Sequence, residues 1–325
     1  MYFDAHSDLL YDVTRRRLAG EDHVLEKYHL DRLRRGGVEG MVLALWTGTG
    51  QGQTFWRNTP EFADDAARTA VMMDCARAEL SQCQPVALVH TVREAEAARE
   101  AGRLYAFLGV EGMAAIGADA GGIDRYYASG IRLGMLTWNE ENPLATGAGG
   151  SAQNKLTAAG RAAVSRMQDL GMLVDVSHLN DGGFWDVIGL ARGPVIASHS
   201  NCRSLCDVRR NLTDSQLRSI RDTGGVVGLN VYHGFVHADP EKQTAEMLAR
   251  HAAHMAEVMG IEHVGCGFDF CEFMGPPDNN GAAGLEDASQ IGNLFYWLEK
   301  LGMTWREREL VARENFLRVF RQVLG

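Results

Sequence analysis

Short apolar runs rich in β-branched residues alternate along the chain with longer segments in which apolar residues recur every three or four positions. The short runs predict buried strands and the longer segments predict amphipathic helices, because side chains repeat about every 2 residues in strands and every 3.6 in helices. Eight such runs occur, at residues 1–4, 37–45, 104–110, 131–137, 172–177, 194–198, 226–231 and 263–268. This alternation predicts an α/β protein, a single (β/α)8 TIM barrel over residues 1–325 with extra C-terminal helices from Leu285 onward packed outside it.

Three of the predicted helices have recognisable ends. A polar residue followed by proline or a helix-forming residue is typical of a helix start, and glycine is typical of the position just after a helix. The predicted starts are Thr59 with Pro60, Thr157, and Asp239 with Pro240, and the predicted ends are near Leu80, Gly171 and Gly260.

Composition and charge narrow the class of protein. Hydrophobic residues make up 46% and charged residues 23% of the 325 residues, as in ordinary globular proteins. The net charge of −10 argues against binding to nucleic acid or to an anionic membrane surface, which both attract basic patches. The chain has no apolar run of about 18 residues that predicts a membrane helix, no signal-peptide pattern and no CxxC pair among its six cysteines. We therefore expect a cytoplasmic protein with reduced thiols.

Candidate metal ligands follow most of the predicted strands. In a barrel of this type the functional side chains come from the carboxyl ends of the strands. Imidazole and carboxylate groups converging there are typical ligands of a divalent metal such as zinc. Their number suggests two ions that share one bridging carboxylate, for which Glu111 is the natural candidate. The strand-end residues are Asp4, His6 and Asp8 after the first strand, Glu111 after the third, His178 after the fifth, His199 after the sixth and Asp269 after the eighth.

Other residues of the same types are expected to have ordinary structural roles. The motif GVEG occurs twice, but Glu39 precedes its apolar run whereas Glu111 follows its run, so Glu39 belongs at the opposite end of the barrel. His251 and His254 are three residues apart in a predicted helix and are expected on a solvated face. Cys202 and Cys206 are expected to be packing residues.

At these positions the sequence resembles the membrane (renal) dipeptidase family of zinc peptidases, nearly from end to end. The resemblance implies a dipeptide substrate, tolerance of a D-residue at its C-terminal position, hydrolysis by a metal-bridging hydroxide and a possible homodimer. The segments that carry it are FDAHSDLL, GVEG ending at Gly112, DVSH ending at His178, PVIASHSNCRSLCDVRRNLTD from Pro194, GFDF ending at Phe270, and ENFLRVF near the C-terminus.

The resemblance also implies a role for each site residue. His6 and Asp8 would hold one Zn²⁺, His178 and His199 the other, and Glu111 would bridge them. Asp269 would carry a proton from the water to the leaving amine. Substrate-binding residues would be Arg210, which would bind the terminal carboxylate, together with Trp138 and Tyr232.

The chain departs from the family pattern at two places. Trp138 stands where much of the family has histidine, so either its indole N–H donates to the substrate or the ring reshapes the pocket. After Asp269, Cys271 and Glu272 replace the aspartate and glycine of the family pattern. We take these as changes in specificity and loop geometry, because the presumed ligands and Asp269 are all present.

Two other functions remain open from the sequence. The first is another binuclear amide or ester hydrolase, such as a deaminase or lactonase; such enzymes commonly begin with HxH, and Asp8 in the second position favours the dipeptidase. The second is a metal-binding protein that has lost catalysis, which the changes at Trp138 and Cys271 would motivate. Both remain alternatives to the dipeptidase hypothesis.

Overall fold

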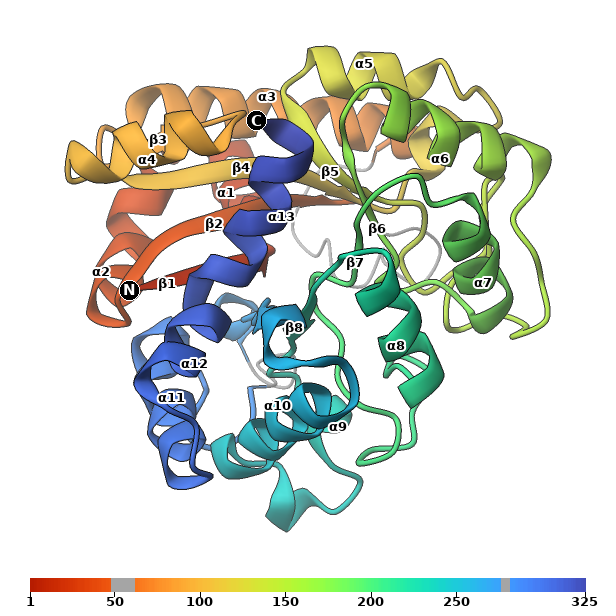
Figure 1. The fold of residues 1–325 in the computed structure, drawn as a ribbon. Helices are drawn as coiled ribbons and strands as arrows, with labels where there is room; N and C mark the ends of the chain where they lie inside the picture. The colour runs from red at the N-terminus through yellow and green to blue at the C-terminus, as the bar shows by residue number, and fades with distance from the viewer. Residues whose placement is uncertain (48–61, 276–280) are drawn as a thin grey trace.

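The computed structural model describes residues 1–47, 62–275 and 281–325, and a curled parallel sheet lies at its centre (Figure 1). Six strands are hydrogen-bonded in the order β1-β2-β4-β5-β6-β7, and β8 pairs with β9. A single bridge between Ala197 and Val227 joins β7 to β8, and the amide of Asp269 donates to the carbonyl of His6 (3.2 Å) across the gap between β9 and β1. These strands are β1 (Tyr2–Ser7), β2 (Val38–Trp46), β4 (Leu104–Glu111), β5 (Ile131–Met135), β6 (Leu173–Asp175), β7 (Val195–Ile196), β8 (Val227–Leu229) and β9 (Val264–Cys266).

All eight predicted strands are present, so the α/β barrel prediction is confirmed. One further strand, β3 (Val86–Leu88), was not predicted. It pairs with the first three residues of β4, on the same edge where β5 pairs with the last four. It therefore extends the sheet at its amino end and adds no strand to the barrel wall.

The helices lie mostly around the outside of this sheet (Figure 1). Several begin at a Thr, Asp or Asn side chain that accepts a hydrogen bond from a free amide of the first turn, as in α4, α6 and α7. Their bounds are α1 Leu9–Leu18, α2 Leu30–Arg35, α3 Asp65–Gln82, α4 Val92–Glu100, α5 Gly122–Ala128, α6 Ala158–Asp169, α7 Asp181–Leu190, α8 Asp214–Asp222, α9 His233–Val236, α10 Ala245–Met259, α11 Ile291–Lys300, α12 Trp305–Glu309 and α13 Asn315–Leu324.

One of the three predicted helix starts is confirmed. Thr157 caps α6 by accepting a hydrogen bond from the amide of Gly160 (3.0 Å), and Gly171 follows the helix with φ +70°. The predicted start at residues 59–60 lies outside the described residues, but α3 itself begins only after Asp64, which caps it.

The predicted start at Asp239 is wrong for the long helix. Asp239 caps only a single 3-10 turn, Pro240–Lys242, whereas α10 begins after Thr244, whose side chain accepts from the amide of Met247. Thr244 forms a β-bridge with Ala283, and this pairing holds the backbone between the 3-10 turn and α10 in an extended conformation. A cap motif in the sequence could not reveal that distant contact.

Helix α13 covers the barrel end at which the strands begin, which amends the expectation that all C-terminal helices pack outside. In Figure 1 it runs across the front of the strands. Its Phe320 ring meets Phe3 and Phe107 edge to face, with ring centroids 5.3 and 4.9 Å away, and Phe316 packs in the same cluster of buried interior side chains. One mouth of the barrel is thus filled, which leaves the carboxyl ends of the strands for the functional site.

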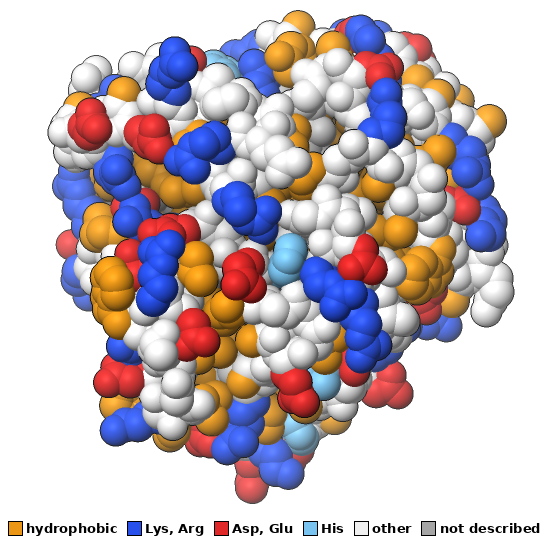
Figure 2. All heavy atoms as spheres, viewed as in Figure 1, with side chains coloured by type: hydrophobic (Ala, Val, Ile, Leu, Met, Phe, Trp, Pro, Cys, Tyr) orange, Lys and Arg blue, Asp and Glu red, His pale blue; other side chains and the backbone are white. Residues whose placement is uncertain are grey.

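The face of the molecule in Figure 2 carries Lys and Arg side chains interspersed with Asp and Glu. Within the described residues, no helix has both the length and the apolar character needed to cross a membrane.

Candidate metal centre

The structure brings the predicted strand-end residues together. His6 lies within β1 and Asp8 follows that strand, while Glu111 is the last residue of β4. His178, His199 and Asp269 each lie three residues beyond the end of their strands β6, β7 and β9. The backbone is left-handed at His178 (φ +72°) and at Asp269 (φ +60°), a conformation that is unfavourable for residues other than glycine and is often found at functional sites.

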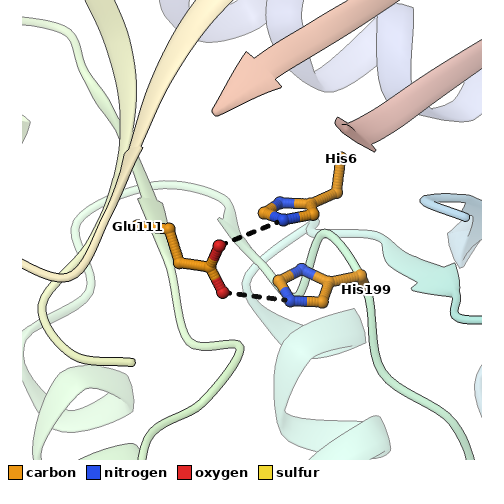
Figure 3. Close-up of side chains that lie close together, drawn as sticks. All are labelled: His6, Glu111 and His199. Carbon is orange, nitrogen blue, oxygen red and sulfur yellow. Dashed lines mark ion pairs between the residues drawn. The ribbon is translucent and has the colours of Figure 1, made fainter. Parts of the chain in front are cut away.

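The carboxylate of Glu111 faces the rings of His6 and His199, which stack with their centroids 3.7 Å apart (Figure 3). Its Oε2 is 3.3 Å from Nε2 of His6, and its Oε1 is 2.6 Å from Nε2 of His178 and 3.8 Å from Nε2 of His199. Nε2 of His6 also lies 3.5 Å from Asp8 Oδ1 and 4.0 Å from Asp269 Oδ1. Oε2 of Glu111 therefore faces His6, whereas Oε1 faces His178 and His199.

Unpaired buried atoms show that this centre fits divalent cations. Nε2 of His6, Oδ1 of Asp8 and Oε2 of Glu111 are buried without a hydrogen-bond partner. An unsatisfied buried polar atom costs about 1–3 kcal/mol, and more when the group is charged. These atoms come from the ends of β1 and β4 and lie close to one another, so cations held between them would satisfy all three.

The protonation of the imidazoles suits metal binding on one side of the centre. Burial, followed by the positive charges of Arg210 and His6, holds the pKa of both His178 and His199 well below its usual range, so these rings are neutral ligands. For His6, burial opposes the charged form, but Glu111 and Asp8 outweigh it and raise the pKa. A bound cation would take the place of that proton.

Hydrogen bonds at Nδ1 of His178 and of His199 fix which nitrogen of each ring faces the centre. Nδ1 of His178 lies 2.9 Å from Asn139 Oδ1, and Nδ1 of His199 lies 2.7 Å from Ser198 Oγ. The two Nε2 atoms are left only 2.9 Å apart, directed at the same point. Such partners orient metal-binding histidines and select the tautomer. Asn139 was not anticipated from the sequence.

Asp269 lies beside this cluster at the pocket wall. Its Oδ2 accepts a hydrogen bond from Asn230 Nδ2 (2.9 Å), which leaves Oδ1 facing His6. Burial raises the pKa of Asp269 to about 6 against the opposing charge of His6. Asn230 was also missed, although its position directly after β8 is the same strand-end signal that located the other residues.

A pocket of about 610 Å³ opens over the cluster, and all three predicted substrate residues line it: Trp138, Arg210 and Tyr232. The guanidinium of Arg210 is buried and donates to Ser200 Oγ and to the carbonyl of His199, both at 3.2 Å, while its Nε has no partner. Burial lowers the pKa of Arg210 to about 10. A buried guanidinium with a free donor beside a metal centre is suited to bind a carboxylate.

A family assignment agrees with this geometry. The model of the membrane dipeptidase family, peptidase family M19, matches residues 1–324. The chain belongs to this family. It is 35% identical over 230 residues to a dipeptidase of Schizosaccharomyces pombe, an alignment that spans 69% of this chain and 54% of the yeast protein. It is 34% identical over 223 residues to a Klebsiella pneumoniae protein described by its location 5′ of pqqA. That alignment spans 66% of this chain and 80% of the Klebsiella protein.

A solved structure from the same class supports the fold and the type of site. The metallopeptidase of Rhodobacter sphaeroides, bound to a phosphinate mimic of the dipeptide L-Ala-D-Ala, superposes with a TM-score of 0.85 at 25% identity, over 99% of both chains. The family assignment and this likeness identify the chain as a metallo-dipeptidase type of enzyme, which implies dependence on metal.

The two departures from the family pattern have different surroundings. The ring of Trp138 packs edge to face against Trp46, with ring centroids 5.4 Å apart, within the pocket. Sγ of Cys271 donates to the carbonyl of Asp269 (3.5 Å) and lies 3.9 Å from its Oδ1. Glu272, in contrast, pairs with Arg32 of α2 at 2.5 Å and is not among the residues that line the pocket.

The residues of the same types elsewhere have structural roles. Glu39 lies buried at the start of β2, at the opposite end of the barrel from the candidate metal centre, and pairs with Arg313 (3.3 Å). The expectation that His251 is solvated is wrong. It is fully buried, its Nδ1 accepts from the amide of Cys202 (3.0 Å), and its Nε2 donates to the carbonyl of Val236 (2.8 Å). Helical spacing cannot show which face a neighbouring loop covers.

Proposed function

We propose that the protein hydrolyses dipeptides with two zinc ions held by His6, Asp8, Glu111, His178 and His199. The observation that carries the proposal is the carboxylate of Glu111, whose Oε2 faces Nε2 of His6 and whose Oε1 faces Nε2 of His178 and of His199. Membership of the dipeptidase family supports the reaction type. The donor set of imidazoles and carboxylates supports zinc as the metal.

The chain's own residues would move the proton. The five ligands would hold the ions, whose chemistry when bound would be to make a water molecule more acidic and to polarise the peptide carbonyl. Asp269 would accept the proton at Oδ1, the oxygen that Asn230 does not engage, and deliver it to the departing amine.

Arg210 would limit the substrate to two residues. Its guanidinium would bind the terminal carboxylate on one side of the centre, so that the peptide bond next to the C-terminal residue lies over Glu111. We also propose that a D-residue is tolerated at the C-terminal position. Support for this comes from the Rhodobacter sphaeroides relative, which was solved with a mimic of L-Ala-D-Ala.

The test is hydrolysis by the zinc-reconstituted chain of L-Ala-D-Ala, L-Ala-L-Ala, a tripeptide, an N-acyl amino acid and a lactone. We expect turnover of the dipeptides and at least about tenfold less of the other compounds. Turnover confined to the N-acyl amino acid or the lactone would favour the other hydrolase classes. About two zinc ions per chain without any turnover would favour a protein that binds metal only.

The two GVEG motifs provide a matched pair of variants. Glu111→Gln removes one negative charge from between the ligand groups, and we expect it to lose bound zinc and at least about 10³-fold in kcat/KM. Glu39→Gln changes the same residue type in the same local sequence at the other end of the barrel, and should retain both. Metal content and melting temperature are measured alongside activity. Full activity in a folded Glu111→Gln variant would overturn the assignment of the bridging residue.

A further inference from the structure

One sector of the pocket is formed by two indole rings. Trp46 and Trp138 both line the pocket and meet edge to face, with ring centroids 5.4 Å apart and planes inclined by 64°. Trp46 is only 3% exposed and is supported by Tyr11, whose ring centroid is 5.6 Å away. The thioether of Met274 lines the same pocket. This is a pre-formed apolar wall, because its rings are held by contacts within the protein.

The order of strands places this wall opposite Arg210. Trp46 ends β2 and Trp138 follows β5, so the two flank β4 and its Glu111. Arg210 is held against the loop after β7, and its guanidinium carbon lies 5.4 Å from the ring of Phe235, which follows β8. In a closed circle of eight strands, the seventh, β8, is opposite the third, β4. The metal centre therefore lies between the guanidinium and the indoles.

The proposed function, on which this inference rests, gives the substrate a direction across the pocket. With the terminal carboxylate at Arg210 and the peptide carbonyl over Glu111, the N-terminal residue extends toward the sector between β2 and β5. Its ammonium group then lies near the carboxylates of Asp8 and Asp269, and its side chain faces Trp46 and Trp138. We propose that this wall selects dipeptides whose N-terminal residue has a large apolar side chain, such as Phe, Leu or Met.

The position of the charged groups explains why polar side chains would be disfavoured there. Among the described residues that line the pocket, the charged ones belong to the centre itself or to the loop that bears Arg209 and Arg210. Asn139, the amide nearest in sequence to Trp138, is already paired with His178. A lysine or aspartate side chain placed against the indoles would lose water, and an ammonium–ring contact or an indole N–H would offset only part of that loss. Burial of a leucine or phenylalanine side chain in place of alanine supports a preference of about 10- to 100-fold.

The experiment is a series of dipeptides with one C-terminal alanine, in the chirality that the enzyme turns over faster, and Phe, Leu, Ala, Asp or Lys at the N-terminal position. We measure kcat/KM with the zinc-loaded full chain. Phe and Leu should exceed Ala by about 10- to 100-fold, and Asp and Lys should fall below Ala. If the Ala-Ala substrate is hydrolysed and Phe and Leu bring no gain, the inference fails and the proposed function stands. If no dipeptide is hydrolysed, the proposed function fails.

Variants then assign the preference to the wall. Trp138→Ala and Trp138→His should each reduce the Phe-to-Ala ratio to about threefold or less, whatever their overall activity. Trp185→Ala is the control, because that indole is 40% exposed on α7 and does not line the pocket. It should leave the ratio unchanged. Melting curves show whether each variant is folded. If Trp138→Ala does not fold, the Phe-to-Ala ratio of Trp138→His tests the assignment. An unchanged ratio in a folded Trp138 variant would overturn the assignment.

Discussion

His251 should make the stability of the protein depend on pH between 4 and 6.5. The ring lies buried on α10 as the neutral tautomer, with Nδ1 accepting from Cys202 and Nε2 donating to Val236. Protonation at Nδ1 would place an N–H against the amide of Cys202 and bury a positive charge. Burial, helped by the charges of His254 and His237 and opposed by the hydrogen bond to Val236, lowers the pKa of His251 to about 4.

The sign and size of the effect follow from the two pKa values. The unfolded chain has a histidine pKa of about 6.5, so as the pH falls it takes up the proton before the folded protein does. The contribution of neutral His251 to stability is therefore complete above about pH 6.5 and is lost as the pH falls to about 4. At about 1.4 kcal/mol per pH unit, the loss over this interval is about 3 kcal/mol.

Urea unfolding of the wild type and of His251→Gln, in the same zinc-loaded state, measures this effect. Glutamine keeps a donor and an acceptor but does not titrate. The wild type should be the more stable at pH 7, and its advantage should shrink by about 2 kcal/mol at pH 4.5, where most of the interval has been crossed. Metal ligands titrate in both proteins, so their effect cancels in the difference. Parallel pH profiles would refute the reasoning.

Two further changes test the pocket and the packing beneath it. Arg210→Lys should raise KM for dipeptides about tenfold or more and leave hydrolysis of the corresponding dipeptide amides almost unchanged, because only the free carboxylate engages the planar guanidinium; equal losses on both substrates would contradict a carboxylate site. Gly267→Ala should lower the unfolding free energy by at least about 2 kcal/mol, because the new Cβ would lie 1.7 Å from the carbonyl oxygen of Ser198. Gly189→Ala, which meets nothing within 4 Å, should match or slightly exceed the wild type in the same thermal melts.

The barrel could be predicted because most of its strands lie in short, mainly apolar runs, a pattern typical of parallel strands buried on both faces. The limits of the prediction follow from contacts that are not local. Strand β3 is no shorter than β6, β8 or β9, and only its pairing with the first residues of β4 shows that it belongs to the sheet. The start of α10 depends on pairing between Thr244 and Ala283, which are distant in sequence.

The strand-end positions located the candidate site because chain direction decides which end of a parallel sheet a residue occupies. That argument separated Glu111 from Glu39, although both lie in the same four-residue motif. It gave no role to His251, whose partner Cys202 is 49 positions away. Nor did it identify Arg210, because only the folded loop after β7 shows that this guanidinium is buried.

Two buried aspartates explain how the strand ends hold this arrangement. Oδ1 of Asp4 accepts from the amides of His6 (3.3 Å) and Phe268 (2.8 Å), and so ties the end of β1 to the segment that carries Asp269. Oδ1 of Asp175 accepts from the amides of Ser177 (2.9 Å) and Ser198 (3.1 Å), next to His178 and His199 in sequence.

Asp4 joins the ends of β1 and β9, and Asp175 joins the ends of β6 and β7. Each pair of segments includes a residue with a left-handed backbone, Asp269 in the first and His178 in the second. Such backbone conformations persist only where surrounding contacts hold them. The carboxylates of the centre therefore divide by role. Asp8, Glu111 and Asp269 face the pocket, whereas Asp4 and Asp175 lie behind it and fix the segments that aim the imidazoles. Residue type and spacing alone could not separate these two roles, since Asp4 belongs to the same alternating series as His6 and Asp8.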